Sequence, residues 1–499
     1  MISIRKIGAA LSACLAVMAS AGSALAGGTT APALPNTYSF PGASNWGPQQ
    51  NGPLLQCLAD VSVTTVAKTA CRIAIVGDST SAGHCAIAGS PCIDSRASSW
   101  SYQLAAMLAA SGAPVTTDSW WGCSNETSVS ACMTFDPRLS VGTGWTLLSQ
   151  TGIGSFGAIE FPANTTPTDL TFTGSQPYNQ ADIYLINGTA AASFSVDRAG
   201  SAPSSSTVVA STGSACTVSG ATVTTASGSL GHCLVRFTWA TTAAGGLDVV
   251  ATSNATGKFY IEAQSERDIN SPKIEFYNMS IGGSSSVSWY QPGVSGYNAY
   301  ALAGSNFANP LVTFNVLGIN DWNSPTTALA TYQSNMTAMQ AQANSTGENI
   351  FIMGMQSNPA SFASVATQAQ YGAITQALAA EANQPWINFQ YRWTNWVNGC
   401  ALGFYGSNSG SCDGRHGSAM GYNDQARMIF GLMAPLIANS GPTAPALQGF
   451  TVANLPASGN VVGQQVYVTN ATACTSGSSP TGGGSTFCTE TWNGTAWVH

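Results

Sequence analysis

The chain has 499 residues, of which 7% are charged and 44% are hydrophobic, and its formal net charge is −7 at pH 7. An acidic chain lacks the basic surface that nucleic-acid binding requires, and the ordinary apolar content excludes a largely disordered chain. This length gives room for two or three domains.

The first 26 residues have the features of a secretory signal peptide. A basic pair at 5–6 precedes an apolar segment at 7–21, and residues 24–26 (Ala-Leu-Ala) form a cleavage motif. We therefore expect cleavage near Ala26 and secretion, either extracellular or periplasmic. The alternative is a membrane anchor, but the apolar segment is too short to span a bilayer and the sequence contains no second one.

Twelve of the 13 cysteines lie beyond this segment and fall into close neighbours. In an oxidising compartment, sequential pairing gives six short-loop disulfides, although other connectivities stay open from the sequence. The rival interpretation is a metal site, but Cys-x-x-Cys spacing is absent and the few histidines are scattered, so we expect neither a metal nor a cofactor. The expected pairs are Cys57–Cys71, Cys85–Cys92, Cys123–Cys132, Cys216–Cys233, Cys400–Cys412 and Cys474–Cys488.

Residues 27–66 contain many prolines and glycines, which predicts an irregular N-terminal lead-in. Residues 67–135 are expected to begin an α/β unit. Residues 71–77 form a short apolar run that ends at a glycine, as a buried parallel strand does. Residues 98–110 have helical spacing, and a further strand is expected near Val115.

Residues 136–269 have a different pattern. Short alternating segments are separated by Ser, Thr and Gly turns, which predicts an all-β sandwich inserted into the α/β unit. The expected strands are 169–173, 181–186, 192–197, 233–239, 247–252 and 258–263.

The α/β pattern returns at 270–440, where strands alternate with helices. This alternation predicts a parallel sheet covered on both faces. Prolines mark a linker at 441–447, and residues 448–499 have the pattern of a small C-terminal β module. The expected strands are 273–277, 311–317, 349–353 and 386–389, and the expected helices are 326–343, 362–380 and 421–438.

Three short blocks in the α/β regions carry groups suited to acyl transfer. Ser79 follows an apolar strand in Gly-Asp-Ser, at the carboxyl end where open α/β sheets bind ligands. Asn320 follows another strand in Gly-Ile-Asn-Asp and can donate its amide to an oxyanion. His416 stands three residues after Asp413, which can reach its second ring nitrogen and fix the tautomer. Nucleophile, base, orienting acid and oxyanion donor together predict ester hydrolysis through an acyl-enzyme. His84 lies close to Ser79 in sequence, and we expect it to line the pocket as a bystander or a substrate contact.

These blocks resemble those of the SGNH or GDSL hydrolases, serine esterases with a flavodoxin-like three-layer fold. The resemblance implies Ser79 as nucleophile, His416 as base and Asp413 as orienting acid. It also implies an oxyanion hole made by the backbone N–H of Ser79, the amide of Asn320 and the N–H of Gly283.

The match is looser around Gly283. Residues 278–283 read Asn-Met-Ser-Ile-Gly-Gly, in which Ser280 replaces the family's first glycine, and Gly282 is the alternative oxyanion donor. The resemblance covers about 67–135 and 270–440. Ser79 and Gly283 are 204 positions apart (283 − 79), more than is usual in the family, and the inserted β domain accounts for this distance.

Three features favour an acylated glycan as the substrate: the export signal, an inserted β domain as in bacterial polysaccharide O-acetylesterases, and aromatic residues near the blocks. Among these, Trp289 and Trp322 are candidates to stack on sugar rings, although a core position is the commoner role of a tryptophan. The inserted sandwich is a candidate carbohydrate-binding module.

The alternatives are a lipase or aryl esterase, an acyltransferase that uses the same residues, and a catalytically inactive glycan-binding protein or adhesin. The sequence contains no Gly-x-Ser-x-Gly block, which disfavours the α/β-hydrolase fold. Oligomeric state is not predicted.

Overall fold

The computed structural model describes residues 38–40, 43–46, 51–62, 70–119, 123–124, 126–147, 159–161, 168–188, 190–211, 215–227, 231–251, 257–290, 308–323, 327–390, 392–440, 449–450, 452–455, 465–473, 479–483, 486–492 and 495–498. The predicted signal peptide at 1–26 and the predicted linker at 441–447 lie outside these residues.

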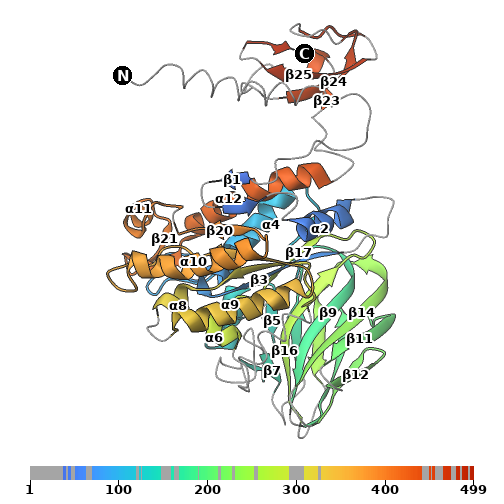
Figure 1. Ribbon diagram of the computed structural model, residues 1–499. Coiled ribbons are helices and arrows are strands. Elements are labelled where there is room, and N and C mark those ends of the chain that lie inside the picture. Colours follow the sequence, from blue (N-terminus) through green and yellow to red (C-terminus); the bar gives the residue numbers. More distant parts are fainter. Residues whose placement is uncertain are drawn as a thin grey trace.

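An eight-stranded sheet forms the centre of the α/β part, in the order β1-β2-β20-β19-β18-β3-β17-β4 (Figure 1). The strands from β20 to β4 run parallel, and β2 and β1 add to the β20 edge in antiparallel fashion. The strands are β1 (Tyr38–Phe40), β2 (Ala43–Trp46), β3 (Cys71–Gly77), β4 (Val115–Thr116), β17 (Ile274–Asn278), β18 (Val312–Val316), β19 (Glu348–Met353) and β20 (Trp386–Asn388).

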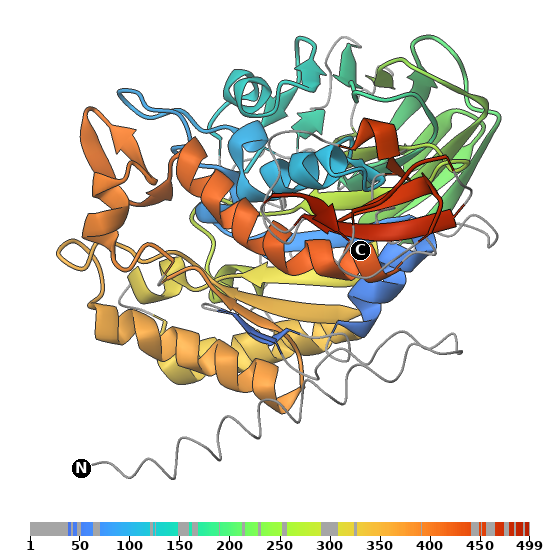
Figure 2. The ribbon, with the colours of Figure 1, turned by 90° about the horizontal axis from the view of Figure 1, so that it is seen from above.

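Helices cover both faces of this sheet, which explains why the residues of β17, β18 and β19 are all buried. On one face lie α2 (Gly52–Ser62), α4 (Trp100–Ala110) and α12 (Ala419–Ser440), and on the other lie α9 (Leu329–Asn344) and α10 (Val365–Glu381) (Figure 1). Figure 2 shows α12 beside α4, and α9 beside α10. Shorter helices are α3 (Ser79–Ala82), η1 (Arg96–Ser98), α5 (Val129–Phe135), α6 (Ser286–Trp289), α8 (Ile319–Asn323), α11 (Trp396–Ala401) and η2 (Val452–Asn454).

The predicted irregular lead-in at 27–66 needs correction in its described part, which contributes β1, β2 and α2. Leu54, Cys57 and Val61 are buried at helical spacing on α2, and Cys57 is disulfide-bonded to Cys71 at the start of β3. Prolines and glycines lie between these short elements, so composition averaged over the segment obscured them.

Two six-stranded antiparallel sheets follow β4 in the sequence and share one hydrophobic core. Every segment predicted as a strand between 169 and 263 contributes to one of them. One sheet has the order β12-β13-β10-β15-β8-β5 and the other β11-β14-β9-β16-β7-β6. Their bounds are β5 (Leu139–Val141), β6 (Thr146–Leu147), β7 (Ile159–Phe161), β8 (Asp169–Phe172), β9 (Tyr178–Asn187), β10 (Ser193–Arg198), β11 (Ser205–Ser211), β12 (Cys216–Ser219), β13 (Thr222–Thr225), β14 (His232–Ala243), β15 (Leu247–Ala251) and β16 (Phe259–Arg267).

A buried ionic network joins the antiparallel sheets to the parallel sheet. Arg267, at the end of β16, contacts Asp182 of β9 at 2.7 Å and Glu275 of β17 at 2.8 Å. It also donates to the hydroxyl of Tyr277 on β17 at 2.9 Å, and Asp182 contacts Arg236 of β14 at 2.7 Å. Because every charge has a partner, the network fixes how β16 leads into β17.

The last sheet has the order β23-β24-β25-β26 and lies within the predicted C-terminal β module. Its strands are β23 (Gly449–Phe450), β24 (Gln465–Ala471), β25 (Thr486–Trp492) and β26 (Trp497–Val498). In the described part of the chain, no helix is both long and apolar enough to cross a membrane.

Five of the six expected disulfides are present: Cys57–Cys71, Cys85–Cys92, Cys123–Cys132, Cys216–Cys233 and Cys400–Cys412. Cys474 lies outside the described residues, so the sixth pair stays a prediction. Five disulfides suit a protein of an oxidising, extracellular compartment.

Candidate active site

Ser79 lies where β3 ends and α3 begins. Asp78 caps this short helix, because its Oδ1 accepts from the backbone N–H of Thr80 at 2.8 Å and from its hydroxyl at 2.7 Å. Burial raises the pKa of Asp78 to about 6, although the bonds from Thr80 oppose the rise. A Cβ on Gly77 would come within 2.9 Å of Ser280 Oγ, so only glycine lets the end of β3 approach that segment.

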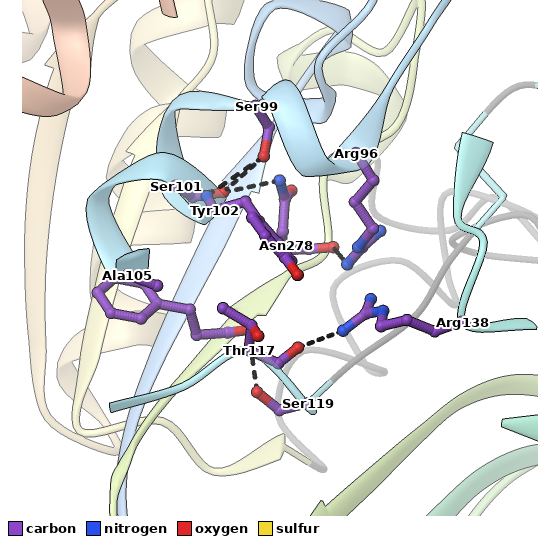
Figure 3. A pocket seen from close by; sticks show the side chains of 10 residues that line it. Arg96, Ser99, Ser101, Tyr102, Ala105, Thr117, Ser119, Arg138 and Asn278 are labelled. Carbon is purple, nitrogen blue, oxygen red and sulfur yellow. Dashed lines mark hydrogen bonds between the residues drawn. The ribbon is translucent and has the colours of Figure 1, made fainter. Parts of the chain in front are cut away.

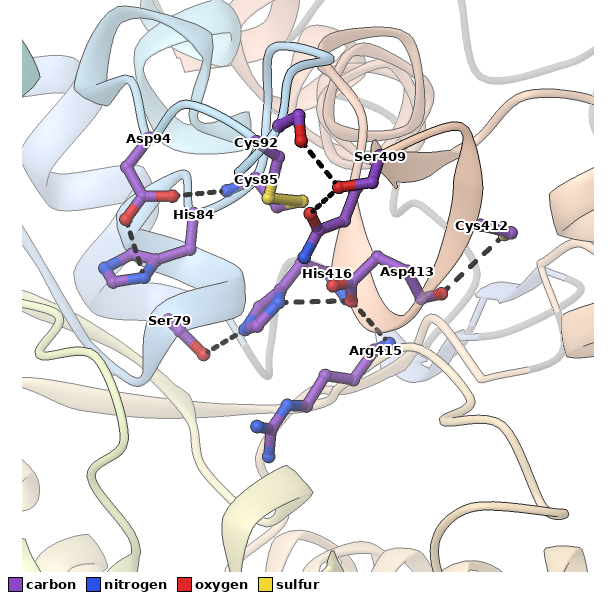
Figure 4. The surroundings of a disulfide bond; sticks show 12 residues. Ser79, His84, Cys85, Cys92, Asp94, Ser409, Cys412, Asp413, Arg415 and His416 are labelled. Atoms are coloured by element: carbon purple, nitrogen blue, oxygen red, sulfur yellow. Dashed lines mark hydrogen bonds and ion pairs between the residues drawn. A yellow bond between two sulfur atoms is a disulfide. The ribbon is translucent and has the colours of Figure 1, made fainter.

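His416 joins Ser79 to Asp413 (Figure 4). Its Nε2 lies 2.9 Å from Ser79 Oγ, and its Nδ1 lies 3.1 Å from Asp413 Oδ1. The backbone N–H groups of Arg415 and His416 also donate to Asp413 Oδ1, at 2.8 and 2.6 Å. Burial alone would raise the pKa of Asp413, but the hydrogen bonds and charge of His416 lower it to about 2. The carboxylate is therefore ionised at neutral pH.

Asp413 and His416 lie on β22 (Ser411–Gly417), which forms a hairpin with β21 (Tyr405–Asn408). The hairpin is held from behind, because Trp396 Nε1 donates to the carbonyl of Asp413 at 3.0 Å. The guanidinium of Arg415 lies 5.0 Å from the ring centre of Phe362. Asp413 and His416 thus lie on a strand that contacts with Trp396 and Phe362 support.

The segment that follows β17 is bonded to the end of β3. Ile281 N–H and Ser284 Oγ both reach the carbonyl of Gly77, at 3.0 Å each. Gly282 N–H donates to Ser124 Oγ at 2.9 Å, whereas Gly283 is exposed and has a φ of +75°. Because the N–H of Gly282 is already bonded to Ser124, Gly283 stays the predicted oxyanion donor of the two glycines.

Asn320 is half-buried on α8, and its Nδ2 donates to the carbonyl of Ser284 at 2.8 Å. This bond places the predicted oxyanion amide against the segment that carries Gly283. Asp321 braces the same segment, because its carboxylate accepts from the N–H of Ser286 at 3.0 Å and from its hydroxyl at 2.7 Å. Burial raises the pKa of Asp321 to about 6.

The predicted stacking role of Trp289 and Trp322 is wrong. Their exposed fractions are 0% and 3%, and their indole N–H groups donate to Ser284 Oγ and Ser357 Oγ. Rings that are packed inside the protein cannot stack on a sugar, so both tryptophans belong to the core.

His84 lies beside the site, with its ring centre 6.0 Å from that of His416. Its Nε2 is 2.9 Å from Ser124 Oγ, and its Nδ1 is 3.0 Å from Asp94 Oδ2. Sequence reasoning missed Ser124 and Asp94. The sequence did contain a signal, because all three residues lie next to paired cysteines: His84 precedes Cys85, Asp94 lies two residues after Cys92, and Ser124 follows Cys123.

The pocket in Figure 3 lies to one side of the site, between α4, β17 and the chain after β4. Its charged lining is already paired: Arg96 and Arg138 both contact Asp136, at 3.3 and 2.6 Å. Asn278 ties this wall to α3, since its Nδ2 donates to the carbonyl of Ser81 at 2.8 Å. The residues that line this pocket therefore help to hold α3, the helix that carries Ser79, in place.

Two groups of described residues bring potential metal ligands together: Cys85, Cys92 and Asp413, and His84, Asp94 and Glu126. In the first group the cysteines are disulfide-bonded. In the second, both ring nitrogens of His84 already face other groups. Neither arrangement presents a free set of ligands.

No model of a known protein family and no curated protein matches the sequence. Among solved structures, one described as a peptidoglycan O-acetylesterase in action matches with a TM-score of 0.52 at 15% identity, over 77% of this chain and 95% of the other. A lipase/acylhydrolase from Enterococcus faecalis (TM-score 0.27, 18% identity, 32% of this chain and 76% of the other) and an acetyl xylan esterase (0.25, 14%, 33% and 82%) match only in part. The first likeness establishes the fold, and the other two carry no argument.

Proposed function

The chain has the fold of the SGNH hydrolases, and from this premise we propose that it is a secreted serine ester hydrolase that removes short acyl groups, such as acetyl, from a glycan. The single observation that carries the proposal is the line of contacts from Ser79 through His416 to Asp413, at 2.9 and 3.1 Å. A serine nucleophile, a histidine base and an orienting acid, in this order, are the groups that acyl transfer requires.

In the first half of the reaction, Ser79 Oγ attacks the ester carbonyl while His416 Nε2 takes the hydroxyl proton. The carbonyl oxygen becomes an oxyanion that receives hydrogen bonds from the N–H groups of Ser79 and Gly283 and from Asn320 Nδ2. The bond to the leaving alcohol then breaks, and His416 returns its proton to that oxygen.

In the second half, His416 takes a proton from water, and the water oxygen attacks the acyl carbon. The bond to Ser79 Oγ breaks, the serine regains its proton from His416, and the carboxylic acid leaves. The ionised carboxylate of Asp413 stabilises the imidazolium that forms in both halves.

The glycan substrate rests on the fold likeness. The matching structure is described as a peptidoglycan O-acetylesterase, and the likeness covers more of this chain than its α/β segments alone can supply. The described aromatic residues of the antiparallel sheets, such as Trp145, Phe237 and Trp239, are buried. They therefore cannot stack on a sugar ring. We expect polar contacts near the rim of the site to select the sugar.

We extend the proposal to domain organisation. A signal peptide at 1–26 precedes a flavodoxin-like core at 67–135 and 270–440, to which β1, β2 and α2 add. An inserted sandwich at 136–269 interrupts this core. A linker at 441–447 leads to the C-terminal β module at 448–499. The strand order β17-β3-β18-β19-β20 supports the flavodoxin-like arrangement.

The test compares wild type, Ser79→Ala and the control Ser205→Ala, an exposed position on β11, on acetylated peptidoglycan, acetylated xylan, p-nitrophenyl acetate and p-nitrophenyl palmitate. We expect wild type and the control to release acetate, and Ser79→Ala to lose about 10⁴-fold or more in kcat while keeping the wild-type Tm. Retained activity in Ser79→Ala would contradict the assignment. Preference for palmitate would identify a lipase instead.

A further inference from the structure

A second serine, histidine and aspartate stand in line beside the first. His84 places Nε2 at 2.9 Å from Ser124 Oγ and Nδ1 at 3.0 Å from Asp94 Oδ2. Asp94 is held in turn, because its Oδ1 accepts from the N–H of Cys85 at 2.6 Å. Figure 4 shows the His84–Asp94 pair on the opposite side of Ser79 from Asp413.

The donors and acceptors of this second line have one consistent assignment. Gly282 N–H donates to Ser124 Oγ at 2.9 Å, so the hydroxyl proton of Ser124 is free to donate to His84 Nε2. His84 then carries its proton on Nδ1, directed at Asp94. Burial, only partly opposed by Asp94, lowers the pKa of His84 to about 4, which keeps this neutral form at neutral pH.

Ser124 is not placed to act as a nucleophile. Unlike Ser79, its oxygen already accepts a hydrogen bond from the backbone N–H of Gly282, at 2.9 Å. What it does contact is the backbone one residue before Gly283. The hydroxyl of Ser124 is thus hydrogen-bonded to the segment that is proposed to bind the oxyanion.

We propose that Ser124, His84 and Asp94 form a positioning relay that fixes the Gly282–Gly283 backbone in the orientation needed for oxyanion binding. Gly283 has a φ of +75°, and no atom lies within 4 Å of the position that a Cβ would take, so no side chain packs against it on that side. Consecutive glycines are free to rotate, and a displacement of about 1 Å in such a group costs about 100-fold in rate. The relay supplies the fixed contact from the side away from β3.

This inference rests on the proposed function, and its test separates the two. The variants are Ser124→Ala, His84→Ala, the double variant, His84→Gln, and Ser130→Ala as an exposed control on α5. The substrate is p-nitrophenyl acetate, with wild type and Ser79→Ala measured in parallel. If hydrolysis does not depend on Ser79, the proposed function fails; if it does and Ser124→Ala equals wild type, only the relay fails.

We expect Ser124→Ala and His84→Ala each to lower kcat about 10- to 100-fold with little change in KM. The double variant should cost no more than either single variant, because the residues act as one unit. Affinity for a boronic acid that forms a tetrahedral adduct on Ser79 should fall by the same factor as kcat. His84→Gln keeps an acceptor and a donor and should recover part of the loss.

Three results would overturn the relay. A rise in KM at unchanged kcat would make His84 a substrate contact, and additive losses would separate the two residues. Labelling of Ser124 by a fluorophosphonate in Ser79→Ala would make it a second nucleophile. If Ser124→Ala does not fold, His84→Gln and the boronic-acid affinity carry the same decision.

Discussion

The carboxylate of Asp413 does two things with one oxygen: it faces His416 Nδ1 and it accepts the N–H groups of Arg415 and His416. The same atom therefore shapes the turn of β22 and sets the tautomer of the base. Because its pKa is lowered to about 2, this carboxylate stabilises the folded protein at any pH above the usual pKa of an aspartate. That stabilisation is lost as the pH falls towards 2.

Asp413→Asn should lower kcat about 10²- to 10⁴-fold, since an amide N–H in place of an oxygen favours the wrong tautomer of His416. The measurement is kcat on p-nitrophenyl acetate, with Asp424→Asn, which loses a contact to Arg392, as the control. An Asp413→Asn enzyme within threefold of wild type would mean that another group orients the ring.

At the residue scale, sequence reasoning located the groups that lie in short ordered blocks. Ser79, Asn320, Asp413 and His416 each sit at the end of a predicted strand or in a short motif, and the structure brings Ser79, Asp413 and His416 into contact. Ser124 belongs to no block and meets His84 only through the fold. Trp289 and Trp322 were misjudged because a tryptophan near a motif has the same sequence signature whether it faces the cleft or the core.

The loop closed by Cys85–Cys92 contacts the β21–β22 hairpin, which carries Asp413 and His416, and we call this contact the rim. Gly89 N–H donates to the carbonyl of Ser407 at 3.2 Å, and Ser409 N–H donates to the carbonyl of Gly89 at 2.8 Å. These bonds connect the loop closed by Cys85–Cys92 to the turn end of the β21–β22 hairpin, where Cys412 pairs with Ser407 and is disulfide-bonded to Cys400 of α11. The rim therefore transmits the rigidity of one loop to Asp413 and His416.

Replacing Cys85 and Cys92 together by serine should lower kcat/KM about tenfold by loosening this hairpin, with a loss of about 2–3 kcal/mol in stability. The control replaces Cys216 and Cys233, which lie in the antiparallel sheets. It should lose a similar amount of stability and keep wild-type kinetics. Equal kinetic losses in the two double variants would show that the rim has no special role.

Element prediction succeeded where apolar spacing is regular and failed where elements are short. The parallel strands from 71 to 388 were anticipated in position, and so were six strands of the antiparallel sheets (β8, β9, β10, β14, β15 and β16). The strands β11, β12 and β13 were not anticipated. The strands β1 and β2 have three and four residues, too few for a period to emerge. They form because the edge of β20 offers unpaired backbone groups.

For the whole molecule, several buried acids with raised pKa values make stability fall as pH rises, and Glu348 is one of them. Glu348, at the start of β19, has an exposed fraction of 2%. Burial raises its pKa from 4.5 to about 8, although the backbone N–H of Leu54 opposes the rise. The folded state therefore holds a proton that the unfolded state releases between these values, and stability falls as pH rises through that window.

Glu348→Gln should remove the part of this pH dependence that Glu348 contributes. Between pH 5 and pH 9 the Tm of wild type should fall more than that of the variant, and at pH 9 the variant should melt about 3 °C or more above wild type. Calorimetry at both pH values, with the exposed Glu381→Gln as control, makes the measurement. If the curves of Tm against pH for wild type and Glu348→Gln ran parallel, ionisation of Glu348 would not destabilise the folded state.

The position of the antiparallel sheets in the chain has a consequence for the order of folding. Cys71 of β3 pairs with Ile274 of β17, 203 positions later (274 − 71). The chain enters and leaves the antiparallel sheets side by side, since Ser119 bridges Ser265 and Glu266 N–H donates to the carbonyl of Asp118 at 2.9 Å. Once those sheets have folded, the long loop between β3 and β17 shrinks to a short one, which removes most of its closure entropy. The nucleophile is thus synthesised early but meets its oxyanion backbone late, so in refolding experiments we expect recovery of esterase activity to trail the formation of the antiparallel sheets.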